Sequence, residues 1–488
     1  MLFSSFSFLF VFLPLTLAAY WLVRNRFDSI SAGQSVILMA SLVFMAASTW
    51  LDLALLLTSL AVNWLFLNGL ARSENGRRKA VLAIAVTFNL GFIGVFKYAD
   101  LFADTLSNVM TVAVPEPHLP LPLAISFYTF QLIALLVENA RHRWPMPQAK
   151  MMALFFSFFP HLLAGPLLWF HEIRPQLERL RPLATETFFP GMMMLSIGLF
   201  KKAVLADSLA PLANSYFSGL EKGALPGLID AWAGTLSYTF QIYFDFSGYS
   251  DMAVGLALLF GVSLPVNFYS PYKAASIIDF WRRWHMTLSR FLREYLYFPL
   301  GGNRRGTVRR WINLMLTMTI GGLWHGASWN FALWGGAHGL MLAINHAWRG
   351  VGFALPRPLA WAFAFTGVVF CWVLFRTHTL AAASANFAGM LGINGIAIPP
   401  SYAAALAKLM TVIPGIYVSG AGVFRPPDLI LLAICGVISL AMPNSEQLVR
   451  DRDGLLLRSW PGPAFCGVLA TLGLMSIFHP VSFIYFRF

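Results

Sequence analysis

The chain has 488 residues, of which 58% are hydrophobic and only 11% are charged. Soluble domains carry about 25% charged residues, so this composition excludes a soluble enzyme or binding module. The net charge of +13 does not indicate nucleic-acid binding, because the Lys and Arg residues fall in short loops between apolar runs. Such runs approach the roughly 20 residues that cross a bilayer, and they recur along the whole length. The sequence therefore predicts an all-α, polytopic membrane protein.

The N-terminal part is predicted to consist of regular membrane spans. The first apolar stretch is too long for a signal peptide, and Arg24 and Arg26 follow it instead of preceding it, so we expect an uncleaved span with its N-terminus outside. The positive-inside rule places 71–79 and 140–144 in the cytoplasm and 104–120, which has no Lys or Arg, outside. Spans of alternating direction are expected over 3–23, 33–50, 51–70, 80–98 and 121–140.

The pattern changes after residue 150. The apolar run 155–177 contains Pro160 and Pro166, which favour a broken or re-entrant segment enclosed by protein or by a water-filled cavity. Longer spans are expected near 188–206 and 231–262. The second carries polar side chains at membrane depth, namely Gln241, Asp245, Ser247, Tyr249, Ser250 and Asp251. Its two carboxylates fit either a hydrogen-bond network that locks helices together or the lining of a polar cavity.

A basic amphipathic stretch covers 277–306. On a helix, one narrow stripe would be apolar and consist of Trp281, Trp284, Leu288, Phe291, Leu292 and Tyr295. The other side would carry Arg282, Arg283, Arg290, Arg293 and Glu294, and such a helix is expected to lie in the membrane interface. His285 would lie at the edge of the stripe. The arginines fit lipid headgroups or the phosphates of a donor such as a coenzyme A thioester; the following "GGNRRG" is not a P-loop.

Two histidines lie in the apolar run "GGLWHGASWNFALWGGAHG" (321–339). Each is either a satisfied packing residue or a working group, and an ionisable side chain inside a membrane segment favours the second interpretation. On one continuous helix, His325 and His338 would lie about 220° apart, so they would share a site only if 326–328 broke the helix.

His325 is the candidate general base of this pair, whereas His338 is expected to pack. Gly322 and Gly326 flank His325 and leave room for close approach of backbone or ligand. A neutral imidazole, which burial favours, can accept a proton from an attacking nucleophile.

Other site chemistries find little support in the sequence. Cys371, Cys435 and Cys466 all lie in predicted spans, which suggests neither a disulfide framework nor a cysteine metal site. No two histidines are three or four residues apart and no HExxH occurs, so no metal is predicted. A self-contained serine hydrolase is not expected either, because the GxSxG elbow is missing.

Seven segments in a fixed order carry a resemblance to a known family. They are "ISFYTFQ" (125–131), "FFPHLLAGP" (158–166), "GLFKKAVLAD" (198–207), "QIYFDFSGYSDMAVGL" (241–256), "NFYSPY" (267–272), "DFWRRWHMTLSRFLREYLYFPLGGNR" (279–304) and the histidine run at 321–339. Together they closely resemble the membrane-bound O-acyltransferase (MBOAT) family. The most similar branch is the membrane subunit that acetylates alginate, cellulose and other exopolysaccharides, or peptidoglycan. The ending "SFIYFRF" (482–488) also fits this branch, whereas His161 stands where a Gln is expected.

The resemblance implies a fold and site residues. It implies a ring of roughly 9–12 transmembrane helices around a thinned centre, with re-entrant and interfacial pieces, where a cytoplasmic opening and an extracellular funnel meet. His325 matches the invariant histidine of the family's WHG motif, and His285 matches the histidine of WRRWH. The single membrane domain divides into N-terminal spans (1–145), a core that carries the motifs (150–350) and C-terminal spans (357–488).

The resemblance also implies a reaction. The protein would take an acetyl group from a cytoplasmic donor, most plausibly acetyl-CoA, and deliver it across the bacterial inner membrane for O-acetylation of an exported polysaccharide. His325 would be the general base, or would carry a transient acetyl group. His285 would orient donor or acceptor, and Arg282, Arg283, Arg290 and Arg293 would contact donor phosphates. A periplasmic SGNH-type partner would complete the transfer, and no bound cofactor is expected.

Two alternatives stay open at this point. The same fold transfers D-alanine from a carrier protein to teichoic acid, or acylates lipids. A different class is a proton-coupled transporter or flippase, in which Asp245, Asp251 and His325 would relay protons. Transporters usually contain internal repeats, and none is found in this sequence.

Overall fold

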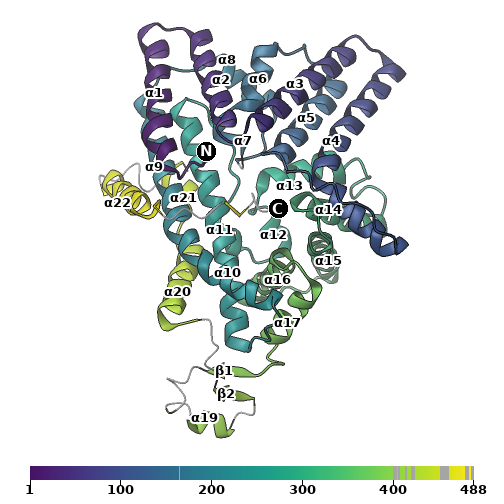
Figure 1. Ribbon diagram of the computed structural model, residues 1–488, viewed down its shortest axis with the longest axis vertical. Helices are drawn as coiled ribbons and strands as arrows, with labels where there is room; N and C mark the ends of the chain where they lie inside the picture. The colour runs from purple at the N-terminus through teal and green to yellow at the C-terminus, as the bar shows by residue number, and fades with distance from the viewer. Residues whose placement is uncertain are drawn as a thin grey trace.

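The structure is a computed structural model of the chain (Figure 1). It describes residues 1–163, 165–398, 404, 407–412, 415–418, 424–450, 461–478 and 483–484. Nearly all of the described elements are helices, which confirms the predicted all-α class. In Figure 1 the N-terminal helices gather in the upper half, α11 runs through the middle, and the helices α10, α16 and α17 lie below.

The N-terminal part follows the predicted order of spans. Its elements are η1 (Phe8–Phe12), α1 (Leu13–Trp21), η2 (Leu22–Arg26), α2 (Ile30–Ala46), α3 (Trp50–Ala71), α4 (Asn75–Met110) and α5 (Ile125–His142). Hydroxyls define two of the starts, since Ser29 and Thr49 accept hydrogen bonds from the backbone N–H groups of Ala32 and Asp52. The helix α4 continues to Met110, well beyond the predicted end of its span at residue 98.

The break predicted within 155–177 is confirmed. Three short helices replace one span there, namely α6 (Ala149–Ser157), α7 (Phe159–Leu162) and α8 (Phe170–Glu178). The described residues between α7 and α8 are buried, as expected for an irregular segment enclosed by protein. The side chain of Ser41 from α2 accepts a hydrogen bond from Phe159 N (3.1 Å) and so satisfies a backbone group at the break.

Two long helical segments cross at the centre of the molecule. The first comprises α9 (Thr185–Phe200), η3 (Lys201–Ala206) and α10 (Asp207–Glu221), and the second is α11 (Leu228–Leu259). A Cβ atom on Gly198 would overlap the carbonyl oxygen of Gly248, and a Cβ on Gly248 would overlap that of Gly198. These paired glycines therefore let the two backbones touch.

The intramembrane carboxylates of α11 form ion pairs with two adjacent lysines of η3. Lys201 Nζ lies 2.6 Å from Asp251 Oδ2, and Lys202 Nζ lies 2.7 Å from Asp245 Oδ1 and 2.7 Å from Asp207 Oδ1. All five residues are largely buried. Of the two interpretations of Asp245 and Asp251, the structure supports the network that locks helices together.

The continuous amphipathic helix predicted over 277–306 is wrong. The chain forms α12 (Ile277–Trp281), α13 (Met286–Leu292) and the π-helical turn η5 (Arg293–Tyr297). The helix is interrupted because two of its backbone groups form hydrogen bonds with a neighbouring segment instead of within the helix. Arg283 O accepts from Tyr269 N, and Met286 N donates to Asn267 O, both at 2.9 Å. Most of the predicted apolar stripe is buried against the protein's own core, with Trp284 only 1% exposed.

The remaining elements complete the helical body and form a small projection. They are η4 (Pro271–Lys273), α14 (Thr307–His325), α15 (Trp329–Val351), α16 (Arg357–Arg376), α17 (Leu380–Met390), β1 (Ile396–Ile398), α19 (Ala407–Val412), β2 (Ile416–Val418), α20 (Pro426–Leu440), α21 (Ser445–Val449) and α22 (Pro461–Ser476). The strands β1 and β2 pair in parallel and project at the bottom of Figure 1. Of the predicted terminal motif 482–488, only Phe483 and Ile484 belong to the described residues, and both are buried.

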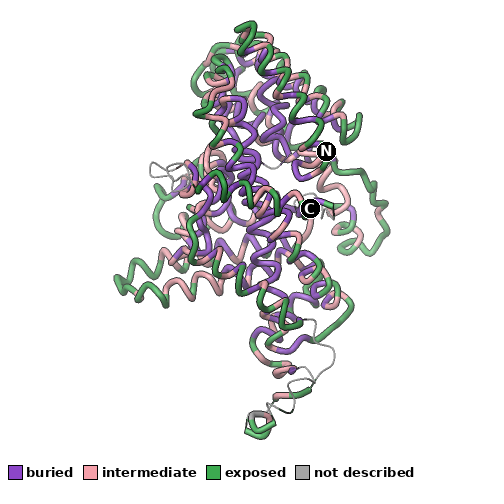
Figure 2. Tube along the Cα trace, turned by 90° about the vertical axis from the view of Figure 1, so that its left-hand side faces the viewer, coloured by how far each residue is buried: buried purple, intermediate pink, exposed green. Residues whose placement is uncertain are grey.

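The surface is apolar, as expected for a multi-pass membrane protein. Within the described residues, five helical segments are long and apolar enough to cross a membrane: Phe8–Arg26, Trp50–Ala71, Asn75–Met110, Thr185–Glu221 and Arg357–Arg376. Three shorter apolar helices are Ile30–Ala46, Pro426–Leu440 and Pro461–Ser476. Many large apolar side chains are exposed. Figure 2 shows the exposed residues in green along the outer parts of the trace and the buried ones in purple inside. The total number of spans, 9–12, stays a prediction.

Candidate active site

His325 is the last residue of α14, and the chain changes direction directly after it. Gly326 is extended, and the hydroxyl of Ser328 caps α15 by accepting a hydrogen bond from Asn330 N (3.1 Å). The break considered for 326–328 is therefore present. The helices α14 and α15 pack closely against each other where glycines face the partner helix. A Cβ on Gly335 would overlap the carbonyl oxygen of Met318.

The ring of His325 lies in an aromatic enclosure that reaches a small pocket. The side chain is 4% exposed, and its ring centroid lies 4.9 Å from Trp324, 5.1 Å from Trp334 and 5.2 Å from Phe375. The pocket has about 50 Å³ of room, enough for a few water molecules. Its lining includes Lys97, Leu121, Pro122, Ser126, Trp324 and His325. Leu121 and Pro122 directly follow the loop predicted to lie outside the membrane.

Lys97 holds the backbone at the end of α14. Its ammonium donates hydrogen bonds to the carbonyl oxygens of Trp324 (2.6 Å) and His325 (3.1 Å), while Tyr98 donates to Leu323 O (2.8 Å). A cation at a helix C-terminus satisfies carbonyls that have no partner within the helix and interacts favourably with the helix dipole. The sequence interpretation missed Lys97, although a lysine inside the apolar run 80–98 was the available signal.

His285 is also brought to this centre, from a different element. It is 0% exposed and precedes α13 in the left-handed conformation, with φ of 42°. The edge position predicted for it on an amphipathic helix is wrong, because the helix is interrupted here. The ring of Trp324 lies 6.1 Å from that of His285 and 4.9 Å from that of His325, so this one ring contacts both histidines.

A chain of hydrogen bonds fixes the orientation and the tautomer of His285. Leu167 N donates to Thr287 Oγ1 (3.0 Å), and Thr287 Oγ1 donates to Asn267 Oδ1 (2.9 Å). The same oxygen lies 3.1 Å from His285 Nδ1 and accepts from Thr287 N (3.4 Å), so His285 Nδ1 is the protonated nitrogen. His285 Nε2 then presents its lone pair, and it has no hydrogen-bond partner among the described residues. Asn267 and Thr287 were not predicted, because only tertiary contact links them to His285.

His338 is enclosed by aromatic rings close to His325. Its ring centroid is 4.8 Å from that of Trp334, whose ring also contacts His325. Trp281 Nε1 donates to His338 Nδ1 (3.3 Å), and His338 is 0% exposed. This environment fits the packing role expected of it.

The four predicted arginines differ in exposure and in partners, and only Arg290 and Arg293 share one, the carboxylate of Glu294. Arg283 pairs with Asp279 (2.9 Å), Arg282 is exposed, and Arg293 is 59% exposed at its side chain. Arg290 is held by three groups: Glu172 Oε1 (2.7 Å), Glu294 Oε1 (3.0 Å) and the face of Trp169, 4.0 Å from the guanidinium carbon. Burial tends to lower the pKa of Arg290, but the hydrogen bonds and charges of Glu172 and Glu294 outweigh this effect and raise it.

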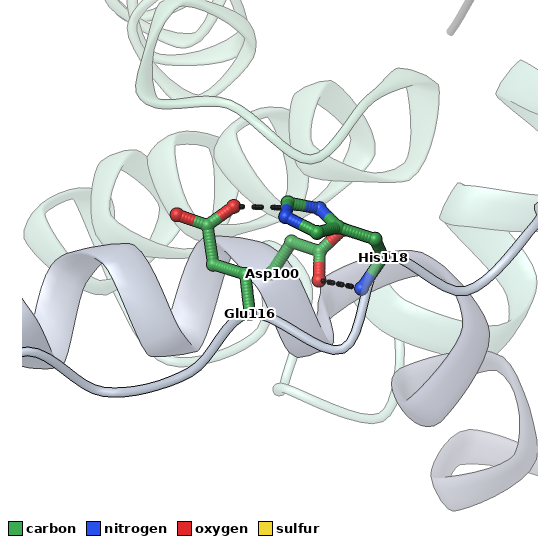
Figure 3. Close-up of side chains that lie close together, drawn as sticks. All are labelled: Asp100, Glu116 and His118. Atoms are coloured by element: carbon green, nitrogen blue, oxygen red, sulfur yellow. Dashed lines mark hydrogen bonds and ion pairs between the residues drawn. The ribbon is translucent and has the colours of Figure 1, made fainter.

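One group of potential metal ligands occurs on the outer side of α4, within the described residues. Figure 3 shows Asp100, Glu116 and His118, whose donor atoms lie within 4.8 Å of one another. His118 Nδ1 is 3.6 Å from Asp100 Oδ2 and 3.7 Å from Glu116 Oε2, and His118 N donates to Asp100 Oδ1 (2.9 Å). These contacts attach the 111–124 loop, which borders the His325 pocket, to α4.

The comparisons with known proteins identify the family of the chain. The sequence model of the MBOAT, membrane-bound O-acyltransferase family, matches residues 7–375. A peptidoglycan O-acetyltransferase of Helicobacter pylori is 35% identical over 100% of this chain and 98% of its own length. A probable alginate O-acetylase AlgI of Azotobacter vinelandii is 41% identical over 81% of this chain and 79% of its own. A teichoic acid D-alanyltransferase of Streptococcus thermophilus is 28% identical over 46% of this chain and 57% of its own.

Proposed function

The chain belongs to the membrane-bound O-acyltransferase family, and on that premise we propose that it acetylates an exported polysaccharide from a cytoplasmic donor. It is an acyltransferase of the membrane. The proposed donor is acetyl-CoA, and the proposed final acceptor, reached through a partner protein, is a hydroxyl of alginate, cellulose, another exopolysaccharide or peptidoglycan. The relatives named as an O-acetyltransferase and an O-acetylase align with most or all of the chain, whereas the D-alanyltransferase aligns with less than half of it.

The observation that carries the proposal is the place of His325. Its ring is buried and lines a pocket that is also lined by Leu121 and Pro122, which follow the predicted outer loop. It lies next to the ring of Trp324, which also contacts His285. In the proposed step, His325 takes the proton of the acceptor hydroxyl as the oxygen attacks the thioester carbonyl. The C–O ester bond forms, the C–S bond breaks, and the thiolate leaves with the proton that His325 held.

The other predicted site residues take supporting roles in this proposal. His285 orients the donor or acceptor through its Nε2, and the exposed Arg282 and Arg293 are the arginines of the predicted set best placed for donor phosphates. We place the protein in the bacterial inner membrane. A periplasmic SGNH-type partner completes the transfer to the polymer.

The test is the ester-linked acetyl content of exported glycans in cells that carry wild type or His325→Ala at equal membrane abundance. Loss of a general base lowers the rate by about 10²–10⁴-fold, so the acetyl ester should disappear from one polymer. His378→Ala is the matched control, because its side chain is exposed and its backbone makes the hydrogen bond to Glu221.

Two outcomes would contradict the proposal. Unchanged acetylation with a well-folded His325→Ala protein would make His325 structural. Loss of D-alanyl esters, with acetyl esters retained, would assign D-alanyl transfer instead. The transporter alternative is separated by the product, because a transporter would function without forming any ester.

A further inference from the structure

A second pocket lies at the opposite end of α5 from the His325 pocket. The C-terminal turn of α5, the following loop and α8 form it, and it has about 270 Å³ of room. Its lining includes Leu135, Asn139, Trp144, His171, Arg174 and Glu178. None of these residues belongs to the proposed active site. The positive-inside rule places this end of α5, with Arg141 and Arg143, in the cytoplasm.

A buried acceptor without a partner lines this pocket. Asn139 is 2% exposed, and its Nδ2 donates to Trp144 O (3.1 Å), which fixes the orientation of the amide. Within the described part of the chain, Asn139 Oδ1 has no hydrogen-bond partner. A buried acceptor in this state is unfavourable, so a ligand that donates a hydrogen bond would be stabilised here.

Aromatic rings and a cation complete the recognition surface. The half-buried Trp144 ring stacks on His142 at 5.3 Å and lies 4.8 Å from His171. Arg174 Nε donates to Glu178 Oε1 (2.6 Å). The two terminal nitrogens of Arg174 make no hydrogen bond within the described residues, so they can hold an anion. A flat base with a donor group, attached to phosphate, matches this combination of stacking, acceptor and cation.

We propose that this pocket binds the adenine nucleotide end of the acyl donor. The base stacks on Trp144, its exocyclic amine donates to Asn139 Oδ1, and a phosphate lies at the terminal nitrogens of Arg174. This inference rests on the proposed function, because it assigns a binding site to the coenzyme A donor proposed there.

The two pockets are separated by a distance that suits a donor with a long flexible arm. Ser126 lines the His325 pocket and Asn139 lines the nucleotide pocket, about 20 Å apart along one helix. Between them α5 presents Phe130, whose ring stacks on Phe291 at 4.6 Å and on Trp324 at 5.5 Å. An arm that follows this aromatic face would bring the thioester to Trp324, next to His325.

The test is calorimetric titration of ADP into the purified full-length protein in lipid nanodiscs. Trp144→Ala should weaken ADP binding at least about fivefold, because base stacking on an aromatic ring contributes at this level, while Trp144→Phe should stay near wild type. Arg174→Gln should weaken ADP binding and raise the KM for acetyl-CoA, with kcat at saturating donor within about twofold of wild type. Arg179→Gln is the matched control, because Arg179 is exposed next to the end of α8 and does not line the pocket.

The outcomes separate this inference from the proposed function. Wild-type protein that does not bind ADP, or Trp144→Ala and Arg174→Gln proteins that bind it as wild type does, would overturn the nucleotide pocket. ADP binding that depends on Trp144 and Arg174, in a protein that never consumes acetyl-CoA, would support the pocket and overturn the proposed acetyl-CoA reaction.

Discussion

Which ring nitrogen of a buried histidine carries the proton depends on the hydrogen-bond partners of the two nitrogens. Asn267 Oδ1 accepts from the hydroxyl and the backbone N–H of Thr287, so it can only receive the proton of His285 Nδ1. The consequence is a lone pair on Nε2 in the protein interior. Lys97 has a different role, since it holds the carbonyls of Trp324 and His325 and thus the end of α14.

At the residue scale, we predict that Asn267 acts through His285. Asn267→Ala should lower kcat about tenfold, because members of one hydrogen-bond network are coupled by about 0.5–3 kcal/mol. In a His285→Ala background the same substitution should have almost no further effect. The measurement is acetyl transfer by the four proteins of the double-mutant cycle, with thermal unfolding as a check on folding. Additive losses would show that Asn267 acts on its own.

Helix contacts in this protein depend on glycines at a few crossing points. The hairpin of α14 and α15 presents His325 at its turn, and its two backbones touch because Gly335 has no side chain facing Met318. Its neighbour Gly336 faces a more open space, where the closest atom to an added Cβ is Thr319 Oγ1 at 3.6 Å. Identical residues one position apart therefore carry very different constraints.

At the element scale, we predict that Gly335→Ala destabilises the hairpin whereas Gly336→Ala does not. The extra methyl group at residue 335 forces the helices apart, at a cost of about 1–3 kcal/mol, and shifts His325 relative to Trp334. The unfolding temperature Tm in detergent and the rate of acetyl transfer should both fall for Gly335→Ala, and neither should fall for Gly336→Ala. Equal behaviour of the two variants would mean that the hairpin can relax without loss.

Buried charges connect distant parts of the chain across the whole molecule. Asp251 Oδ2 accepts from Lys201 Nζ and from Ser445 Oγ of α21, both at 2.6 Å. Asp245 Oδ2 accepts from Ile484 N (2.7 Å), which attaches the end of the described chain to α11. The central helices and the C-terminal segments are thus held by two clusters of ion pairs and hydrogen bonds, one around Asp251 and one around Asp245.

At the scale of the molecule, we predict that Lys201→Met destabilises the fold by about 3–5 kcal/mol, because it leaves Asp251 buried without its cation. The double variant Lys201→Met with Asp251→Leu should recover part of that loss, since neither charge is then buried alone. Membrane abundance and thermal unfolding of the two proteins provide the measurement. A single variant as stable as wild type would show that water or another cation replaces Lys201.

The amino-acid sequence alone is enough to predict the fold class, the break points and the two candidate histidines. Composition predicts a membrane protein, because a chain with so few charges cannot cover a surface that faces water. Prolines and glycines predict the breaks at 155–177 and 326–328, because they disrupt or loosen local helix geometry. The carboxylates of α11 were recognised for the same kind of reason, since a buried charge must find a partner.

Only the tertiary structure decided which residues meet. The amphipathic pattern of 277–306 predicts one helix, but Asn267 and Tyr269 take backbone groups that the helix would need, and His285 turns inward as a result. Lys97 and Asn267 were not predicted, because no local period connects them to their partners. The partners of Lys97 lie more than 200 residues away, and those of Asn267 follow it by 18 and 20 residues after a break in helical structure. Hydrophobic periodicity reports which side of a helix is buried, whereas the packing of helices determines what that side contacts.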